Sequence, residues 1–154
     1  MAARRRGRVT ARGEPALIAA LPASLILAHG RSLAGVRLGD TAADVRAQLG
    51  TNYGVCRGCA TTTWYFTYKR FQAKGLAVEL TRGRVSAVYT LWQPPAADVT
   101  NKITIGAPQE KVGAAISVSC SGYTALVRGT SVYIVVDGRV WGFGLFRRRE
   151  SPCR

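Results

Sequence analysis

The sequence predicts an α+β fold in which two tandem units, each a short helix followed by a three-stranded antiparallel meander, pack into one domain. Three observations lead to this prediction. The chain has 154 residues, a length that suits one ordinary domain and not two. The segment Val36 to Gly50 matches Ile103 to Ser117 at a constant offset of 67 residues. Each of these segments is followed by stretches rich in aromatic and β-branched residues, which are typical of strands.

The first element, residues 1–30, is typical of an export signal. Five arginines precede the apolar run Pro15 to Ala28. This run has the length of a signal-peptide hydrophobic region, whereas a membrane span needs about 20 apolar residues. We expect cleavage after Ala28 or Gly30; an uncleaved amphipathic or disordered arm is the alternative. No membrane span is expected to remain, and the protein is predicted to be secreted or to lie in the cell envelope.

The first unit, residues 31–96, begins with a helix. Val45 and Leu49 lie four residues apart and share one helix face, Asp40 or Thr41 can cap the helix, and Gly50 ends it. The Gly-x-Val-x-x-Val spacing in the last strand indicates a β-bulge. The expected strands are Thr61–Phe71, Leu76–Thr81 and Arg84–Trp92.

The second unit, residues 97–154, repeats this order after the proline-containing linker Gln93 to Thr100 and ends in a basic tail. Pro108 suits the first turn of its helix, and Asp137-Gly138 is a strong hairpin signal. The expected strands are Tyr123–Val127, Ser131–Val136 and Arg139–Phe146. One small helix on three strands has little core, so we expect the two units to lie side by side and to share one core.

Four cysteines, Cys56, Cys59, Cys120 and Cys153, are an even set suited to two disulfides in an oxidising compartment. Three pairings are open, and we favour Cys56 with Cys59 and Cys120 with Cys153 because each bridge then stays inside one half of the chain. A redox dithiol is the alternative for Cys56 and Cys59, but this motif follows a helix, the reverse of the thioredoxin order. Zinc would need two more soft ligands at similar spacing, so no metal or other cofactor is expected.

The strongly positive charge of the chain suggests a surface that binds polyanions. Lys and Arg number 22 against 8 Asp and Glu, which gives a formal net charge of +14. Arg147, Arg148 and Arg149 directly follow the last expected strand and are candidates for binding a polyanion, with a solvated tail as the alternative. No nucleic-acid motif accompanies them, so we expect no specific nucleic-acid partner.

The sequence contains few groups suited to catalysis. His29 is the only histidine and lies at the expected cleavage region, so no Ser-His-Asp or Cys-His pair is expected in the mature core. Glu79 is expected on the surface of a strand, and the hairpin turn explains Asp137. We therefore predict that the protein has no enzymatic activity.

The helix motif Gly-x-Thr-x-x-x-Val-x-x-x-Leu-Gly at 39–50, the aromatic strand Thr63 to Phe66 and a final hairpin containing Gly-Arg-Val resemble the SmpA/OmlA (BamE-like) family. Two such units in tandem, each with its own cysteines behind a signal segment, resemble the β-lactamase-inhibitor-protein (BLIP-like) arrangement over Leu33 to Phe146. This resemblance implies a non-catalytic binding module that grips its partner with aromatic residues on an exposed sheet face. BamE-like proteins are lipoproteins of outer-membrane assembly, and this chain lacks their lipidated cysteine.

The candidate partner-binding residues are Tyr65, Trp92, Tyr133 and Trp141. Neighbouring strand residues point to opposite faces, and one face must meet the helices, so core packing is the alternative for each of them. The sequence thus predicts an exported binding module that contacts a protein or cell-envelope partner, of the BLIP-like inhibitor or envelope-assembly type. The alternatives are a basic polyanion-binding envelope protein and a thiol-disulfide oxidoreductase that uses the Cys-x-x-Cys motif of Cys56 and Cys59.

Overall fold

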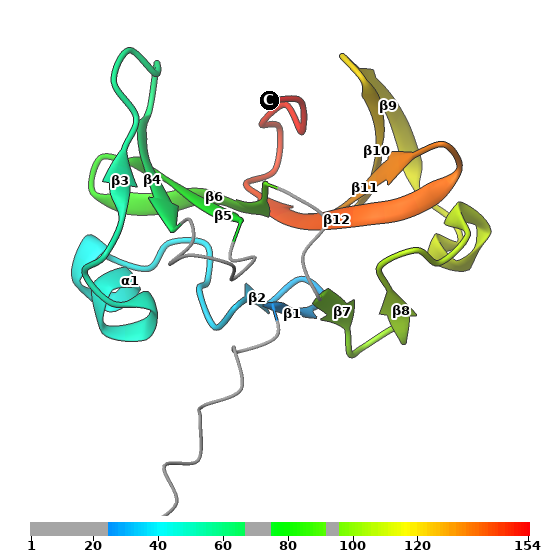
Figure 1. Ribbon diagram of the computed structural model, residues 1–154, viewed down its shortest axis with the longest axis horizontal. Coiled ribbons are helices and arrows are strands. Elements are labelled where there is room, and N and C mark those ends of the chain that lie inside the picture. The colour runs from blue at the N-terminus through cyan, green and yellow to red at the C-terminus, as the bar shows by residue number, and fades with distance from the viewer. Residues whose placement is uncertain (1–24, 67–74, 92–95) are drawn as a thin grey trace, which may run out of the picture.

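The computed structural model of the chain describes residues 25–66, 75–91 and 96–154, which form two β-sheets (Figure 1). The larger sheet is antiparallel and runs in the order β3 (Gly54–Val55), β4 (Thr62–Phe66), β5 (Leu76–Thr81), β6 (Arg84–Thr90), β12 (Arg139–Phe146), β11 (Ser131–Val136), β10 (Tyr123–Arg128), β9 (Ile116–Cys120). The smaller sheet runs in the order β2 (Ser32–Leu33), β1 (Leu25–Ala28), β7 (Ala96–Asp98), β8 (Ile103–Thr104). Helix α1 (Ala42–Leu49) and the 3-10 helix η1 (Gln109–Val112) complete the described elements.

This architecture corrects the predicted fold class, because the described chain is mostly β. Its single α-helix has eight residues, and each half forms a meander of four strands and not three. The second expected helix is a 3-10 helix of four residues, because Gly113 adopts a φ of 73° directly after it and ends it. In the first half, the residue that corresponds to Gly113 is Arg46, and α1 continues through it. With the helix ended at Gly113, Ile116 lies in strand β9 instead of on a helix face.

Helix α1 is short and is held by its cap and by packing. Thr41 is the N-cap: its side-chain oxygen accepts from the backbone N–H of Asp44, whose carboxylate accepts from the N–H of Thr41 at 2.8 Å. Val45 is fully buried, and the guanidinium of Arg46 lies 4.9 Å from the ring centre of Trp64. The expected cap is therefore confirmed.

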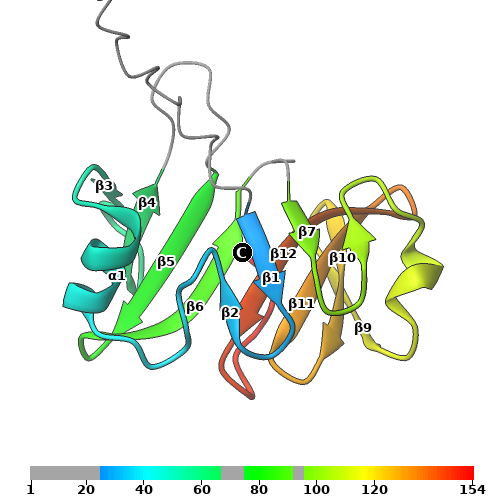
Figure 2. The same cartoon turned by 90° about the horizontal axis from the view of Figure 1, so that it is seen from below.

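The two sheets enclose the main hydrophobic core. The smaller sheet crosses beneath the centre of the larger one (Figure 2), and fully buried residues from both, such as Leu27, Ile103, Val88 and Phe143, belong to one cluster. The opposite face of the larger sheet carries a second, smaller cluster around Tyr89 and Phe146. Both faces of the central strands are therefore covered, which explains why β5 and β6 are buried along most of their length.

The two halves of the chain make matching contacts. The N–H of Gly39 donates to the carbonyl oxygen of Val85 at 2.8 Å, and the N–H of Gly106 donates to that of Val140 at 2.7 Å. In each half the arginine before that valine donates from Nη1 to the carbonyl oxygen of the glycine, at 3.1 and 2.9 Å. The same few residues thus fix the last hairpin to the start of each half.

The halves join where β6 pairs with β12, and Tyr89 pairs directly with Gly144. A Cβ atom at Gly144 would lie 2.6 Å from the ring of Phe146 and 3.3 Å from the Cβ of Tyr89. Only glycine therefore fits at this junction without displacing an aromatic ring. The stacked rings of Tyr89 and Phe146, with centroids 5.6 Å apart, lie over the junction.

The predicted bulge in β6 is confirmed. The register of β5 and β6 shifts so that Glu79 pairs with Ala87 and Leu80 with Val85, which leaves Ser86 as the additional residue. Strands β11 and β12 show the same shift, and there Trp141 is the additional residue.

The folded domain begins earlier in the sequence than expected. Strand β1 is an interior strand of the smaller sheet: it pairs antiparallel with β2 and parallel with β7, and its Leu27 is fully buried. Cleavage after Ala28 or Gly30 would remove this strand, so the folded domain begins at or before Leu25. The rest of the predicted signal lies outside the described residues. In the part of the chain described, no helix is long and apolar enough to cross a membrane.

Candidate functional site

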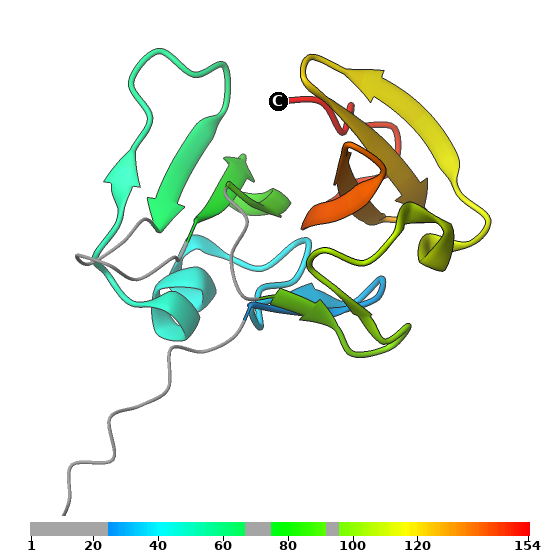
Figure 3. The ribbon, with the colours of Figure 1, turned by 45° about the vertical axis from the view of Figure 1, so that its right-hand side comes forward.

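The larger sheet has one face that neither the helices nor the smaller sheet covers. The hairpins β3–β4 and β9–β10 rise at its two ends, so the sheet curves toward this side (Figures 1 and 3). We call it the concave face and define it by the outward side chains Tyr65, Glu79, Tyr89, Tyr123 and Trp141. Strand alternation and the two bulges place them there, opposite the main core.

The segment after β12, residues 147–154, crosses the concave face between the two raised hairpins (Figure 1). Cys153 is bonded to Cys120 of β9. The hydroxyl of Tyr123 donates to the carbonyl oxygen of Pro152 at 3.2 Å and accepts from the N–H of Arg154 at 2.8 Å. The bridge and these two bonds hold the end of this segment over the middle of the sheet.

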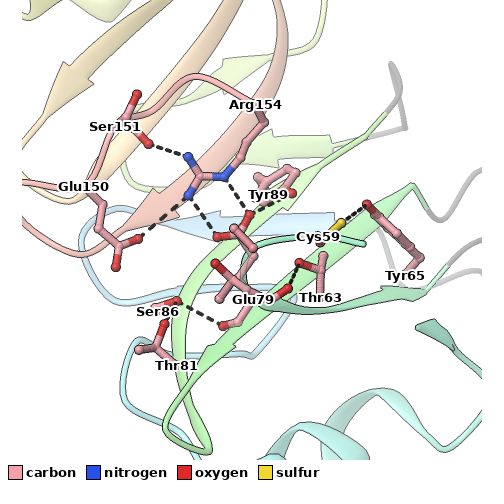
Figure 4. Close-up of a pocket in the computed structure, with 12 residues that line it drawn as sticks. Cys59, Thr63, Tyr65, Glu79, Thr81, Ser86, Tyr89, Glu150, Ser151 and Arg154 are labelled. Atoms are coloured by element: carbon pink, nitrogen blue, oxygen red, sulfur yellow. Dashed lines mark hydrogen bonds and ion pairs between the residues drawn. The ribbon is translucent and has the colours of Figure 1, made fainter. Parts of the chain in front are cut away.

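An ion pair fills the centre of the concave face (Figure 4). Arg154 donates from Nε to Oε1 of Glu79 at 2.6 Å and from Nη2 to Oε2 at 2.9 Å, and the hydroxyl of Tyr89 donates to Oε1 at 3.0 Å. The guanidinium carbon lies 4.9 Å from the ring centre of Phe146. These are the geometries of a bidentate carboxylate pair and of a cation–π contact.

The burial of Glu79 corrects the expectation of a surface residue, because its side chain is only 7% exposed. The hydrogen bonds to Glu79 raise the pKa of Arg154, so the guanidinium stays charged. Burial, together with the negative charge of Glu79, raises the pKa of Tyr89, so its hydroxyl stays protonated and donates. Arg154 lies 75 residues away in the sequence, and no local pattern reveals this pairing.

Two hollows lie beside this ion pair, and Tyr65, Tyr89 and Arg154 line both. The first, of about 530 Å³, has hydroxyl and carboxylate groups among the side chains that line it (Figure 4). The second, of about 590 Å³, is mainly apolar. Residues that line the first include Thr63, Thr81, Ser86, Glu150 and Ser151. Residues that line the second include Leu91, Tyr123, Ile134, Val136 and Trp141.

The structure brings two of the four predicted contact residues together on this face. Tyr65 is half-buried and lines both hollows, and Trp141 is half-buried and lines the second. Trp92 lies outside the described residues. Tyr133 is fully buried, so its prediction as an exposed contact is wrong: in β11 it faces the main core and packs edge-on against Phe143.

Tyr133 belongs instead to a buried polar network around Asp98. Its hydroxyl donates to Oδ2 of Asp98 at 2.6 Å and lies 3.2 Å from Nδ1 of His29. The side chain of Asn101 donates to the same Oδ2, and the N–H groups of Thr100 and Asn101 donate to Oδ1. Burial alone would raise the pKa of Asp98, but the hydrogen bonds from Tyr133, Asn101 and Thr100 lower it overall. This network ties the turn after β7 to β11, which accounts for its burial in the fold.

Both preferred disulfide pairings are confirmed, with Cα–Cα distances of 5.7 Å for Cys56–Cys59 and 5.3 Å for Cys120–Cys153. Cys56–Cys59 closes the loop between β3 and β4, whereas redox Cys-x-x-C pairs rely on a helix N-terminus. Two disulfides indicate an oxidising, extracytoplasmic compartment.

The three predicted polyanion-binding arginines lie in different settings. Arg147 is half-buried, and its N–H donates to the carbonyl oxygen of Ser86 at 3.0 Å. Arg148 and Arg149 are exposed, and neither forms an ion pair with an acidic side chain in the described ranges.

Comparison of the chain with protein-family models, with curated proteins and with solved structures found no match.

Proposed function

We propose that this protein is a non-catalytic binding module that holds a protein partner on its concave face. The observation that carries this proposal is the pair of adjoining hollows, built from strands of both halves, with Tyr65 between them and Trp141 in the apolar one. Aromatic side chains on rigid strands offer a large contact area at a small entropic cost, and they are enriched among residues that dominate binding energy. The BLIP-like resemblance implies the same use of an exposed sheet face.

The charge distribution favours an apolar anchor in the second hollow. Among the described residues, Arg154 is the only charged one that lines it, and Glu79 already pairs with that charge. A partner's aromatic or aliphatic side chain can therefore enter without leaving a buried charge unpaired, which is the large penalty at protein interfaces. The first hollow, with its hydroxyl and carboxylate groups, offers hydrogen bonds to polar groups around that anchor.

We further propose that the protein works outside the cytoplasm, either secreted or in the cell envelope. Its two disulfides support this location, and the arginine-rich segment followed by the apolar residues that precede β1 has the pattern of an export signal.

The test is affinity capture from culture supernatant and envelope fractions with three immobilised proteins: the unaltered chain, Trp141→Ala and Val99→Ala. Val99 is the matched control because it is an exposed apolar residue after β7, on the side of the smaller sheet. The proposal expects a protein that Val99→Ala retains and Trp141→Ala binds at least about tenfold more weakly, the typical loss at a dominant contact. Equal retention by the two variants contradicts it.

A second candidate is polyanion binding, which Arg148 and Arg149 favour because both are exposed and neither forms an ion pair with a described acidic residue. In that case retention on heparin should fall steeply between about 50 and 200 mM salt, and replacing both arginines by glutamine should abolish it. Binding through the aromatic hollows should survive the same change in salt, because it does not depend on counterion release.

A further inference from the structure

The guanidinium of Arg154 occupies a site that is built for it. Two of its donors reach the carboxylate of Glu79, and its Nη1 donates to the carbonyl oxygens of Ser151 and Cys153 at 2.7 and 2.9 Å. Its planar group also lies over the rings of Phe146 and Tyr89, at 4.9 and 5.8 Å from their centres. A bidentate carboxylate beside stacked aromatic rings selects the flat, forked guanidinium over the compact ammonium of lysine.

The carboxylate of Glu79 and both aromatic rings of this site belong to the sheet, whereas the carbonyl oxygens of Ser151 and Cys153 and the carboxylate of Glu150 belong to the segment that fills it. Glu79 comes from β5, Tyr89 from β6 and Phe146 from β12, three neighbouring strands. Tyr89 also fixes the carboxylate, since its hydroxyl donates to Oε1 at 3.0 Å. By contrast, residues 150–154 are each exposed or half-buried and add no residue to either hydrophobic cluster. The part of the site that the sheet supplies is therefore the same for Arg154 and for a guanidinium from outside.

We propose that this site on the concave face, formed by Glu79, Tyr89 and Phe146, recognises an arginine side chain, which Arg154 supplies from within the chain and an arginine of the bound protein supplies when it displaces Arg154. The identity of the second occupant rests on the proposed function; the affinity for a guanidinium does not.

The surroundings make such an exchange geometrically simple. Arg154 borders both hollows, so a partner that fills them meets this site between its two points of contact. The exchange leaves the Cys120–Cys153 bridge intact, because only the side chain after Cys153 has to rotate away. The tethered arginine competes at an effective concentration in the millimolar range. A free arginine compound should therefore bind poorly to the unaltered chain, whereas an arginine presented together with contacts in the hollows can displace Arg154.

The test uses full-length Arg154→Ala protein with both disulfides formed, and N-acetylarginine amide as the probe. Binding is followed by amide chemical shifts at the concave face and by the rise of the thermal midpoint with probe concentration. We expect Arg154→Ala to bind the probe at least tenfold more tightly than the unaltered chain does. N-acetyllysine amide should bind Arg154→Ala at least tenfold more weakly, and the double variant Glu79→Gln/Arg154→Ala should lose the arginine probe.

If Arg154→Ala does not fold, Arg154→Gln replaces it, because the amide can still donate to Glu79. Absence of probe binding, equal binding of the lysine probe, or undiminished binding to the double variant would each overturn the proposal. None of these results contradicts the proposed function, which is tested separately by the loss of partner capture in Trp141→Ala. The two ideas can therefore fail separately.

Discussion

Replacing Tyr133 by phenylalanine tests directly whether this residue is part of the core network and not a contact surface. The change removes the hydroxyl and leaves the ring packed against Phe143. The hydroxyl is fully buried and donates to the carboxylate of Asp98 at 2.6 Å. Hydrogen bonds to charged groups stabilise by about 1.5–3 kcal/mol, and Asp98 retains its other three donors. We therefore expect the free energy of unfolding to fall by about 2 kcal/mol at neutral pH.

The loss should depend on pH in a defined direction. The pKa of Asp98 in the folded protein lies below its ordinary value of 3.8, so its ionised form stabilises the fold above that pH. This contribution is lost as the pH falls through the folded-state pKa. Without the Tyr133 hydroxyl, the pKa of Asp98 moves back up, so less of this contribution remains to be lost. The difference between the two proteins should be largest near pH 7 and should shrink at about pH 3.

The assay is urea unfolding of both proteins at these two pH values with the disulfides intact. A loss below about 0.5 kcal/mol at pH 7, the range of surface substitutions, would refute the reasoning. So would a loss that does not change with pH. A variant of unchanged stability that loses its partner would restore Tyr133 as a contact residue.

Three further changes test other parts of the fold. Gly144→Ala forces a Cβ against the ring of Phe146 and should lower the free energy of unfolding by about 1–3 kcal/mol in urea titrations; an unchanged midpoint would show that the β6–β12 junction yields freely. Replacing both cysteines of the Cys120–Cys153 bridge by serine should lower the free energy of unfolding by about 4 kcal/mol in the loop-entropy model. The same change in the Cys56–Cys59 bridge should lower it by about 2 kcal/mol, because the linked residues are 33 positions apart in the first bridge and 3 in the second. Thermal unfolding compares them, and the opposite order contradicts this account. Thr41→Ala should cost about 1 kcal/mol through the lost cap of α1, and hydrogen exchange of that helix should rise with it.

The strands that the sequence located best are those with dense local signals. The expected Leu76–Thr81 and Ser131–Val136 are β5 and β11 as observed, because β-branched runs flanked by Arg82-Gly83 and Asp137-Gly138 turns specify hairpins locally. Strands β3 and β9 were missed because they are short or mostly exposed and gain their stability from neighbouring strands. The smaller sheet was also missed, since its β1 and β7 are about 70 residues apart and pair only in the folded chain.

In the candidate site, too, the sequence located residues within strands but not the contacts between distant parts of the chain. The sequence nominated four aromatic residues of the expected strands, and two of them, Tyr65 and Trp141, lie on the concave face. It could not assign Tyr133, because its partner Asp98 is 35 residues away. The sequence does predict that Glu79 lies in a strand, and it lies in β5. Its burial, however, depends on Arg154, which only the fold brings to it.

The central claim is that the concave face holds a protein partner, and site-specific photo-crosslinking tests it most directly. A photoreactive phenylalanine is placed at Tyr65 on the concave face or at the exposed control position Val99, and each protein is irradiated in the producing culture. We expect the probe at position 65 to form a covalent adduct with one partner protein, and the probe at position 99 to form none. An adduct from Val99 with none from Tyr65 would place the binding surface on the other side of the molecule and contradict it.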